Sequence, residues 1–76
     1  MKTFVITFSR VGIRDGWVEV QAYSEEIARA WARHEYGQVW SMIYATDKWG
    51  TKQKELFPLG CIGTAVLHYQ HAEHIA

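Results

Sequence analysis

The feature that most constrains the fold is a two-residue alternation at the start of the chain. In residues 2–9 every second side chain is large and apolar, which predicts a strand with one covered face. Residues 17–23 alternate in the same way, with small apolar side chains on one face. Between them, the Asp15-Gly16 pair is typical of a hairpin turn. We therefore expect a β-hairpin whose covered face carries Phe4, Ile6, Phe8, Val18, Val20 and Ala22.

A helix is predicted directly after this hairpin, from about residue 25 to residue 36. The Ser24 hydroxyl can cap the first N–H groups, and Glu25 and Glu26 lie at the positive end of the helix dipole. Gly37 suits the position after the last turn, and Glu25 is spaced to pair with Arg29. The expected packing stripe consists of Ile27, Ala30, Trp31 and His34.

Two further strands are expected in the second half of the chain, over residues 39–45 and 61–69. The polar residues 46–54 read as a connection, and Pro58 and Gly60 predict a turn before the last strand. Residues 1–69 then form a single domain, and residues 70–76 are expected to be a disordered tail.

This order of elements predicts a two-layer α+β fold. If the helix makes a right-handed crossover, the strand 39–45 pairs antiparallel to the first strand. The expected sheet has four strands, is mainly antiparallel, has the order 2-1-3-4 and carries one helix on one face. Its other face would be open. The sequence does not decide which side of the strand 39–45 meets the helix.

Size, charge and cysteine content restrict the class of protein. A chain of 76 residues has room for one core. Eight basic and eight acidic residues give a net charge of zero, so any electrostatic recognition has to be local. A single cysteine, Cys61, cannot form an internal disulfide, and no apolar run approaches the ~20 residues of a spanning helix. We expect a cytoplasmic protein without membrane insertion.

The open sheet face is the first candidate binding site. Val5, Met42 and four aromatic residues would form an apolar patch on it, and aromatic patches of that kind mark protein interfaces. In the alternative arrangement, two of the aromatic residues turn inward against Trp31. The predicted partner-binding residues are Trp17, Tyr23, Trp40 and Tyr44, of which Trp40 and Tyr44 are the two that could turn inward.

The second candidate site is the basic connection after the third strand. An aromatic ring among lysines can stack a base while the lysines hold phosphates. The alternative is a solvated turn, whose charge is partly offset by Asp47 and Glu55. Two arginines of the first hairpin would lie at the opposite end of the sheet. The candidate polyanion contacts are Lys48, Trp49, Lys52, Lys54, Arg10 and Arg14.

Neither a metal site nor an active site is predicted. The spacing of His68, His71 and His74, with Cys61 before them, does not complete a zinc motif. The sequence has no Gly-rich phosphate loop and no recognised nucleophile and base pair, and a thiol in an apolar strand should be inert. We expect no metal, no cofactor and no enzymatic activity.

The segment 17–36, with its strand, Ser24 cap and Ala-rich helix, resembles the strand-to-helix unit of many short phage and mobile-element proteins. Length and layout also resemble the small anti-CRISPR inhibitors. This resemblance implies a phage-encoded protein that docks on a host defence complex, such as a CRISPR-Cas effector, and blocks it sterically. The leading hypothesis is a non-catalytic protein-binding module of this kind. The alternatives are a small nucleic-acid-binding protein and a homodimeric structural component.

Overall fold

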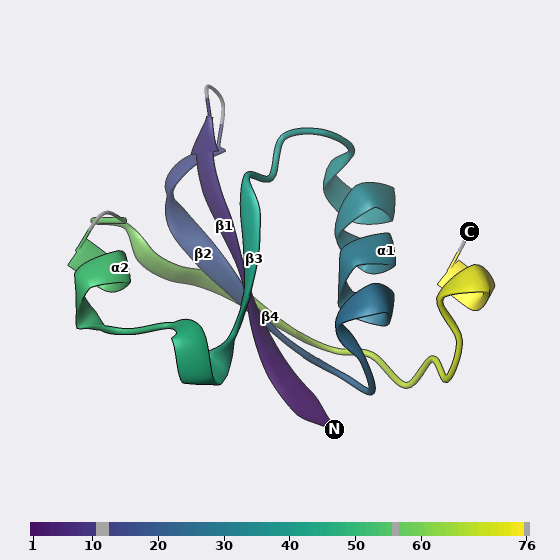
Figure 1. Cartoon of the computed structure of the whole chain (residues 1–76). Coiled ribbons are helices and arrows are strands. Elements are labelled where there is room, and N and C mark those ends of the chain that lie inside the picture. Colours follow the sequence, from purple (N-terminus) through teal and green to yellow (C-terminus); the bar gives the residue numbers. More distant parts are fainter. Residues whose placement is uncertain (11–12, 56, 76) are drawn as a thin grey trace.

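Both alternating segments form long antiparallel strands in the computed structural model. The structure describes residues 1–10, 13–55 and 57–75, without the side chains of residues 9, 10, 13–15 and 74. The sheet lies between α1 on one side and α2 on the other (Figure 1). In chain order the elements are β1 (Lys2–Arg10), β2 (Ile13–Ala22), α1 (Glu25–Tyr36), β3 (Met42–Ala45), the 3-10 helix η1 (Thr46–Lys48), α2 (Thr51–Glu55), β4 (Gly60–Val66) and the 3-10 helix η2 (Ala72–Ile75).

The hairpin of β1 and β2 is longer than predicted. Phe8 pairs with Gly16, but Ser9 pairs with Arg14, so Asp15 is the extra residue of a bulge. The prediction of a turn at Asp15-Gly16 was therefore wrong, because both residues belong to β2. Gly16 serves a different purpose: a Cβ atom there would lie 2.8 Å from Ile62 Cγ2 and 3.2 Å from the Gly60 carbonyl oxygen. The missing side chain lets β4 approach β2.

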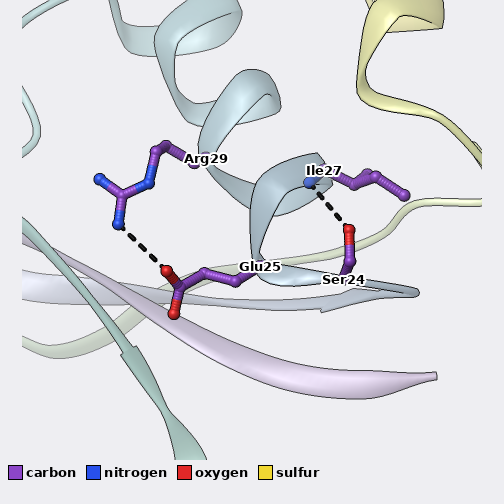
Figure 2. Close-up of polar contacts among 4 residues, drawn as sticks. All are labelled: Ser24, Glu25, Ile27 and Arg29. Carbon is purple, nitrogen blue, oxygen red and sulfur yellow. Dashed lines mark hydrogen bonds and ion pairs between the residues drawn. The ribbon is translucent and has the colours of Figure 1, made fainter.

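Helix α1 begins and ends as the capping residues predict. The Ile27 N–H donates to Ser24 Oγ at 3.3 Å, and Arg29 donates to Glu25 at 3.2 Å on the exposed side (Figure 2). Gly37 has a positive φ of 60°, and its N–H donates to the Arg33 carbonyl at 2.9 Å.

The packing stripe of α1 differs in part from the prediction. Its buried residues are Ile27, Ala28 and Ala32, with Trp31 half-buried beside them. His34 is exposed, so its assignment to the stripe was wrong.

The sheet confirms the predicted α+β class and corrects the strand order. The observed order is β3-β1-β2-β4. As predicted, β3 is antiparallel to β1, but β4 pairs parallel with β2 instead of lying beside β3. The sheet is therefore mixed. Helix α1 leads from β2 to β3 over one face, and the segment with η1 and α2 leads back to β4 over the other face (Figure 1). Opposite directions over opposite faces give both crossovers the same handedness, in keeping with the strong preference for one hand.

The main core lies between the sheet and α1. Ile43 and Ala45 of β3 face it, which settles the orientation that the sequence left open. The end of the chain joins it too, because Leu67 and Ile75 are buried in it and η2 packs against α1. The segment 70–76 was expected to be a disordered tail, but its residues 72–75 form the short helix η2, which packs against α1. The fully or largely buried members are Phe4, Ile6, Phe8, Val18, Val20, Ala22, Ile27, Ala28, Ala32, Leu67 and Ile75.

Candidate functional site

The sheet face opposite α1 holds a second core, built from aromatic rings. Trp49 lies at its centre, with ring centroids 5.3 Å from Trp17, 5.2 Å from Tyr44 and 5.8 Å from Phe57. Trp17 is only 9% exposed and Val5 only 1%. The expectation of an open face was therefore wrong. The segment between β3 and β4 folds over this face, because its own Trp49 and Phe57 need the same burial as the aromatic residues beneath them.

The four residues predicted to bind a partner do not form one surface. Trp17 is buried and its Nε1–H donates to Glu19 at 3.2 Å, while Tyr44 is half-buried in the second core. Trp40 packs instead against the main core on the α1 side, where its Nε1–H donates to the Gly37 carbonyl at 3.1 Å. Of the four, Tyr23 keeps a large exposed fraction, 49%.

In the basic connection after β3, the ring of Trp49 is not available to stack a base. Lys48, Lys52 and Lys54 are exposed, but Trp49 points into the second core, and its buried Nε1–H has no hydrogen-bond partner among the described residues. A ring held between other aromatic rings cannot take a nucleotide base without displacing one of them.

The structure describes the backbones of Arg10 and Arg14, not their side chains, so their role as polyanion contacts stays a prediction. The two arginines were expected at the opposite end of the sheet from the lysine segment. The structure agrees with this for the start of that segment but not for its end. η1 begins where Ala45 pairs with Phe4, far from the hairpin turn, but the segment ends at Gly60, which pairs with Gly16 beside the bulge.

Large exposed apolar side chains gather around the last strand. Leu59, Ile62, Val66 and Tyr69 are 63%, 44%, 52% and 40% exposed. Ile62 and Val66 lie in β4 and the other two flank it. We call these four residues the β4 ridge. From the sequence, this strand was expected beside β3, whereas it lies beside β2, so the side of the strand left open to solvent was not recognised.

β4 is also an edge strand, and some of its backbone groups have no partner within the described part of the chain. The Leu67 N–H donates to the Gln21 carbonyl at 2.8 Å while Val66 is the register partner of Gln21. In a parallel ladder this pattern turns the N–H and C=O of Val66 away from β2, and the two-residue alternation gives Thr64 the same orientation. We call this open side the β4 edge. The strand has the sequence GCIGTAV, so no charged or proline residue protects the edge.

Cys61 lies on the same strand, as expected, and its side chain is exposed. Its Sγ–H donates to the Gly63 carbonyl at 3.3 Å. Within the described part of the chain, no group of three His, Cys, Asp or Glu side chains is placed to hold a metal ion. No helix of that part is long and apolar enough to span a membrane.

A cavity of about 580 Å³ lies at the end of the sheet where β1 begins and β3 ends. Lys2 and Lys48 line it together with Asp47, so cations and an anion share its wall. Its lining contains neither histidine nor cysteine. Its residues are Met1, Lys2, Thr3, Phe4, Ala45, Thr46, Asp47 and Lys48.

No family model matches the chain, and comparison with curated proteins and with solved structures gave no significant match. The candidate site is therefore defined by geometry alone: the β4 edge together with the β4 ridge.

Proposed function

We propose that this protein is a non-catalytic protein-binding module that docks through the β4 edge and the β4 ridge. The observation that carries the proposal is the combination of an unpaired, uncharged strand edge with four large apolar side chains exposed around it. Unpaired edges bind other strands through main-chain hydrogen bonds, and exposed apolar side chains supply the burial that makes such pairing stable.

The chemistry of this surface favours protein over nucleic acid as the partner. The residues of β4 carry no charge, and the whole chain has a net charge of zero. Phosphate backbones are bound by clustered cations, which this surface lacks. Burying one large aliphatic side chain contributes about 1.5 to 3 kcal/mol, so two or three ridge residues are enough to support specific association.

The most specific version of this proposal is a phage-encoded inhibitor, working in the cytoplasm of the host. It would dock on a defence complex such as a CRISPR-Cas effector and block it sterically. The support is the resemblance of the segment 17–36 to a unit of short phage and mobile-element proteins, and of the length and layout to small anti-CRISPR inhibitors. Steric blocking needs a binding surface and no active site, which fits a molecule whose exposed surface feature is an apolar strand edge.

The test is a DNA-cleavage assay with a panel of purified CRISPR-Cas effector complexes. We expect one of them to be inhibited at a one-to-one ratio of protein to effector. The variant Leu59→Lys/Tyr69→Lys should need at least about tenfold more protein, since buried cations oppose docking. The matched control is Met42→Lys, because Met42 is 52% exposed on the opposite edge strand, β3.

Three outcomes would contradict the proposal. If every effector cleaves DNA at its normal rate, the inhibitor version is wrong. If a few molecules of the protein inactivate many effectors, the protein acts catalytically. If Met42→Lys weakens inhibition as much as the ridge variant does, the docking surface is misplaced.

A further inference from the structure

We infer that the β4 edge binds the β4 edge of a second copy of this chain, antiparallel, so that two sheets become one continuous sheet. The inference rests on the proposed function in one respect, because both take the β4 edge to be a docking site. It adds that the strand paired with this edge is β4 of a second copy. The ridge residues outside the paired segment stay available to a further partner.

The usable length of the edge is set by a bulge in β4. Trp17 pairs with Cys61 but Val18 pairs with Gly63, so Ile62 is an extra residue that interrupts the ladder. The regular part runs from Gly63 to Leu67, whose N–H still bonds to β2. A bulge normally discourages edge pairing, but here it lies at the start of the strand and leaves this regular segment open.

The regular segment is compatible with itself in one register. Its middle residue is Ala65, so a two-fold axis through Ala65 pairs Thr64 of each copy with Val66 of the other. Thr64 and Val66 are the residues whose N–H and C=O groups point outward. Each of the two pairs therefore exchanges both N–H···O=C bonds, as the closely spaced pairs of an antiparallel ladder do.

The residue at the axis suits this arrangement. Ala65 would face its own copy as a pair without hydrogen bonds, where the two Cα atoms come within about 4.5 Å. A methyl side chain fits that distance, and Ala65 already packs on the main core from the α1 side. On the opposite face, each Val66 would cover a Thr64 methyl group of the other copy.

Charge also permits a second copy as the partner. Two identical strands bring like charges together wherever a charged residue faces its own copy, and this repulsion is what protects many natural edges. The strand GCIGTAV has no charged residue and the molecule has no net charge. No charge repulsion therefore opposes the pairing of two copies. The edge also carries no charge that would favour a strand of another protein.

Pairing in this register brings the two ridges together. The segment after Leu67, which leads to Tyr69 in each copy, would run past the Ile62 bulge of the other copy. The dimer would therefore present one larger apolar surface in place of two small ones. Because the paired segments are short, the contact should be under about 1,200 Å² and the dissociation constant in the micromolar range or weaker.

Sedimentation equilibrium from about 1 µM to about 1 mM tests the association itself. We expect a monomer-dimer equilibrium in that range. Thr64→Pro removes an outward N–H and leaves the bonds to β2 in place, so the dissociation constant should rise at least about tenfold. Val66→Lys, which places two cations at the contact, is the second variant should the proline disturb the fold. Met42→Lys should dimerise like the wild type.

Electron-electron distance measurement tests the register. Cys61 is the only cysteine of the chain and is exposed, so a thiol-reactive spin label reports on one position. The Ile62 bulge adds a residue without adding a ladder position, so each Cys61 lies three positions from the axis at Ala65. The proposed register therefore separates the two Cys61 Cα atoms by about 20 Å. A parallel pairing would bring them within about 10 Å and would contradict the proposed arrangement.

Other results would overturn the inference. These are a monomer throughout the concentration range, or a dimer that tolerates both Thr64→Pro and Val66→Lys. The inference and the proposed function can fail separately. A monomer that still inhibits an effector through the ridge would refute the dimer alone, and a β4-paired dimer that inhibits none would refute the inhibitor function alone.

Discussion

Trp17 lies where the two-residue alternation puts it, on the face opposite Val18 and Val20. The alternation assigns a residue to a face and says nothing about whether another segment covers that face. In this protein the cover comes from residues more than thirty positions later, Trp49 and Phe57. A residue that the pattern assigns to solvent is therefore part of a core.

This placement predicts unequal effects of two aromatic substitutions. Trp17→Ala should lower the free energy of unfolding by about 3 to 5 kcal/mol, the usual range for removing a large ring from a packed site. Tyr23→Ala should lower it by less than about 1 kcal/mol, because the side chain is half exposed. Urea denaturation of both variants measures the difference. Equal and small effects would mean that the second core contributes little to stability.

Tyr36 makes the stability of the protein sensitive to alkaline pH. Its ring packs edge-to-face on Phe8 at 4.8 Å and on Trp31 at 5.5 Å. Burial, and after it the negative charge of Glu35, raises the pKa of Tyr36 above its ordinary value of 10.0. The folded state therefore favours the neutral phenol more strongly than the unfolded state does.

The sign of the pH effect follows from this difference. The contribution of Tyr36 to stability is fully present below its unfolded pKa and is lost as the pH rises through its folded pKa. Tyr36→Phe should therefore lose less stability than the wild type between about pH 8 and about pH 11. Urea titrations at both pH values make the comparison. An identical loss in the two proteins would show that ionisation of Tyr36 is not linked to unfolding.

At the scale of elements, local signals predicted the first two strands and the helix, although they misplaced the hairpin turn, and no local signal predicted the position of β4. β1, β2 and α1 were predictable because alternation, the Ser24 cap and Gly37 act within a few residues. α2 was missed, since its five residues are too few for an amphipathic pattern and none of them is buried. The position of β4 beside β2 depends on the path of the preceding crossover, which no local pattern encodes.

The contact between β2 and β4 can be tested at the glycine that permits it. Gly16→Ala should destabilise the fold by about 1 to 3 kcal/mol, because the new Cβ atom would meet Ile62 Cγ2 at 2.8 Å. Ile62→Ala removes that methyl group and is itself mild, since the side chain is partly exposed. The double variant should recover part of the loss.

Thermal unfolding of the three variants gives the coupling between the two positions. Recovery should be incomplete, because the Gly60 carbonyl oxygen remains 3.2 Å from the new Cβ atom. Strictly additive effects of the two substitutions would contradict the parallel pairing of β2 with β4 at this point.

At the scale of the whole molecule, the sequence predicted a binding site on a sheet face, and the structure has its candidate site at a sheet edge. Two of the aromatic residues expected on the open face, together with Trp49 and Phe57, instead pack into the second core opposite α1. The exposed apolar surface then falls to β4, where the sequence pattern showed only a strand. Tyr23 is the one predicted partner-binding residue that stays widely exposed, and the three lysines keep their solvent exposure without the ring expected to join them.

The lysines provide the experiment that separates protein binding from polyanion binding. In the variant Lys48→Gln/Lys52→Gln/Lys54→Gln the second core is untouched, because all three side chains are exposed. We expect dimerisation and effector inhibition to change by less than about twofold, since charges outside a contact contribute little to affinity. Binding to a single-stranded oligonucleotide should be weak in the wild type even at low salt. The opposite result would be tight binding of the oligonucleotide by the wild type, with an affinity that falls steeply as salt is added. If the triple variant also loses both this binding and the biological activity, the lysine segment is the functional surface and the β4 edge is not.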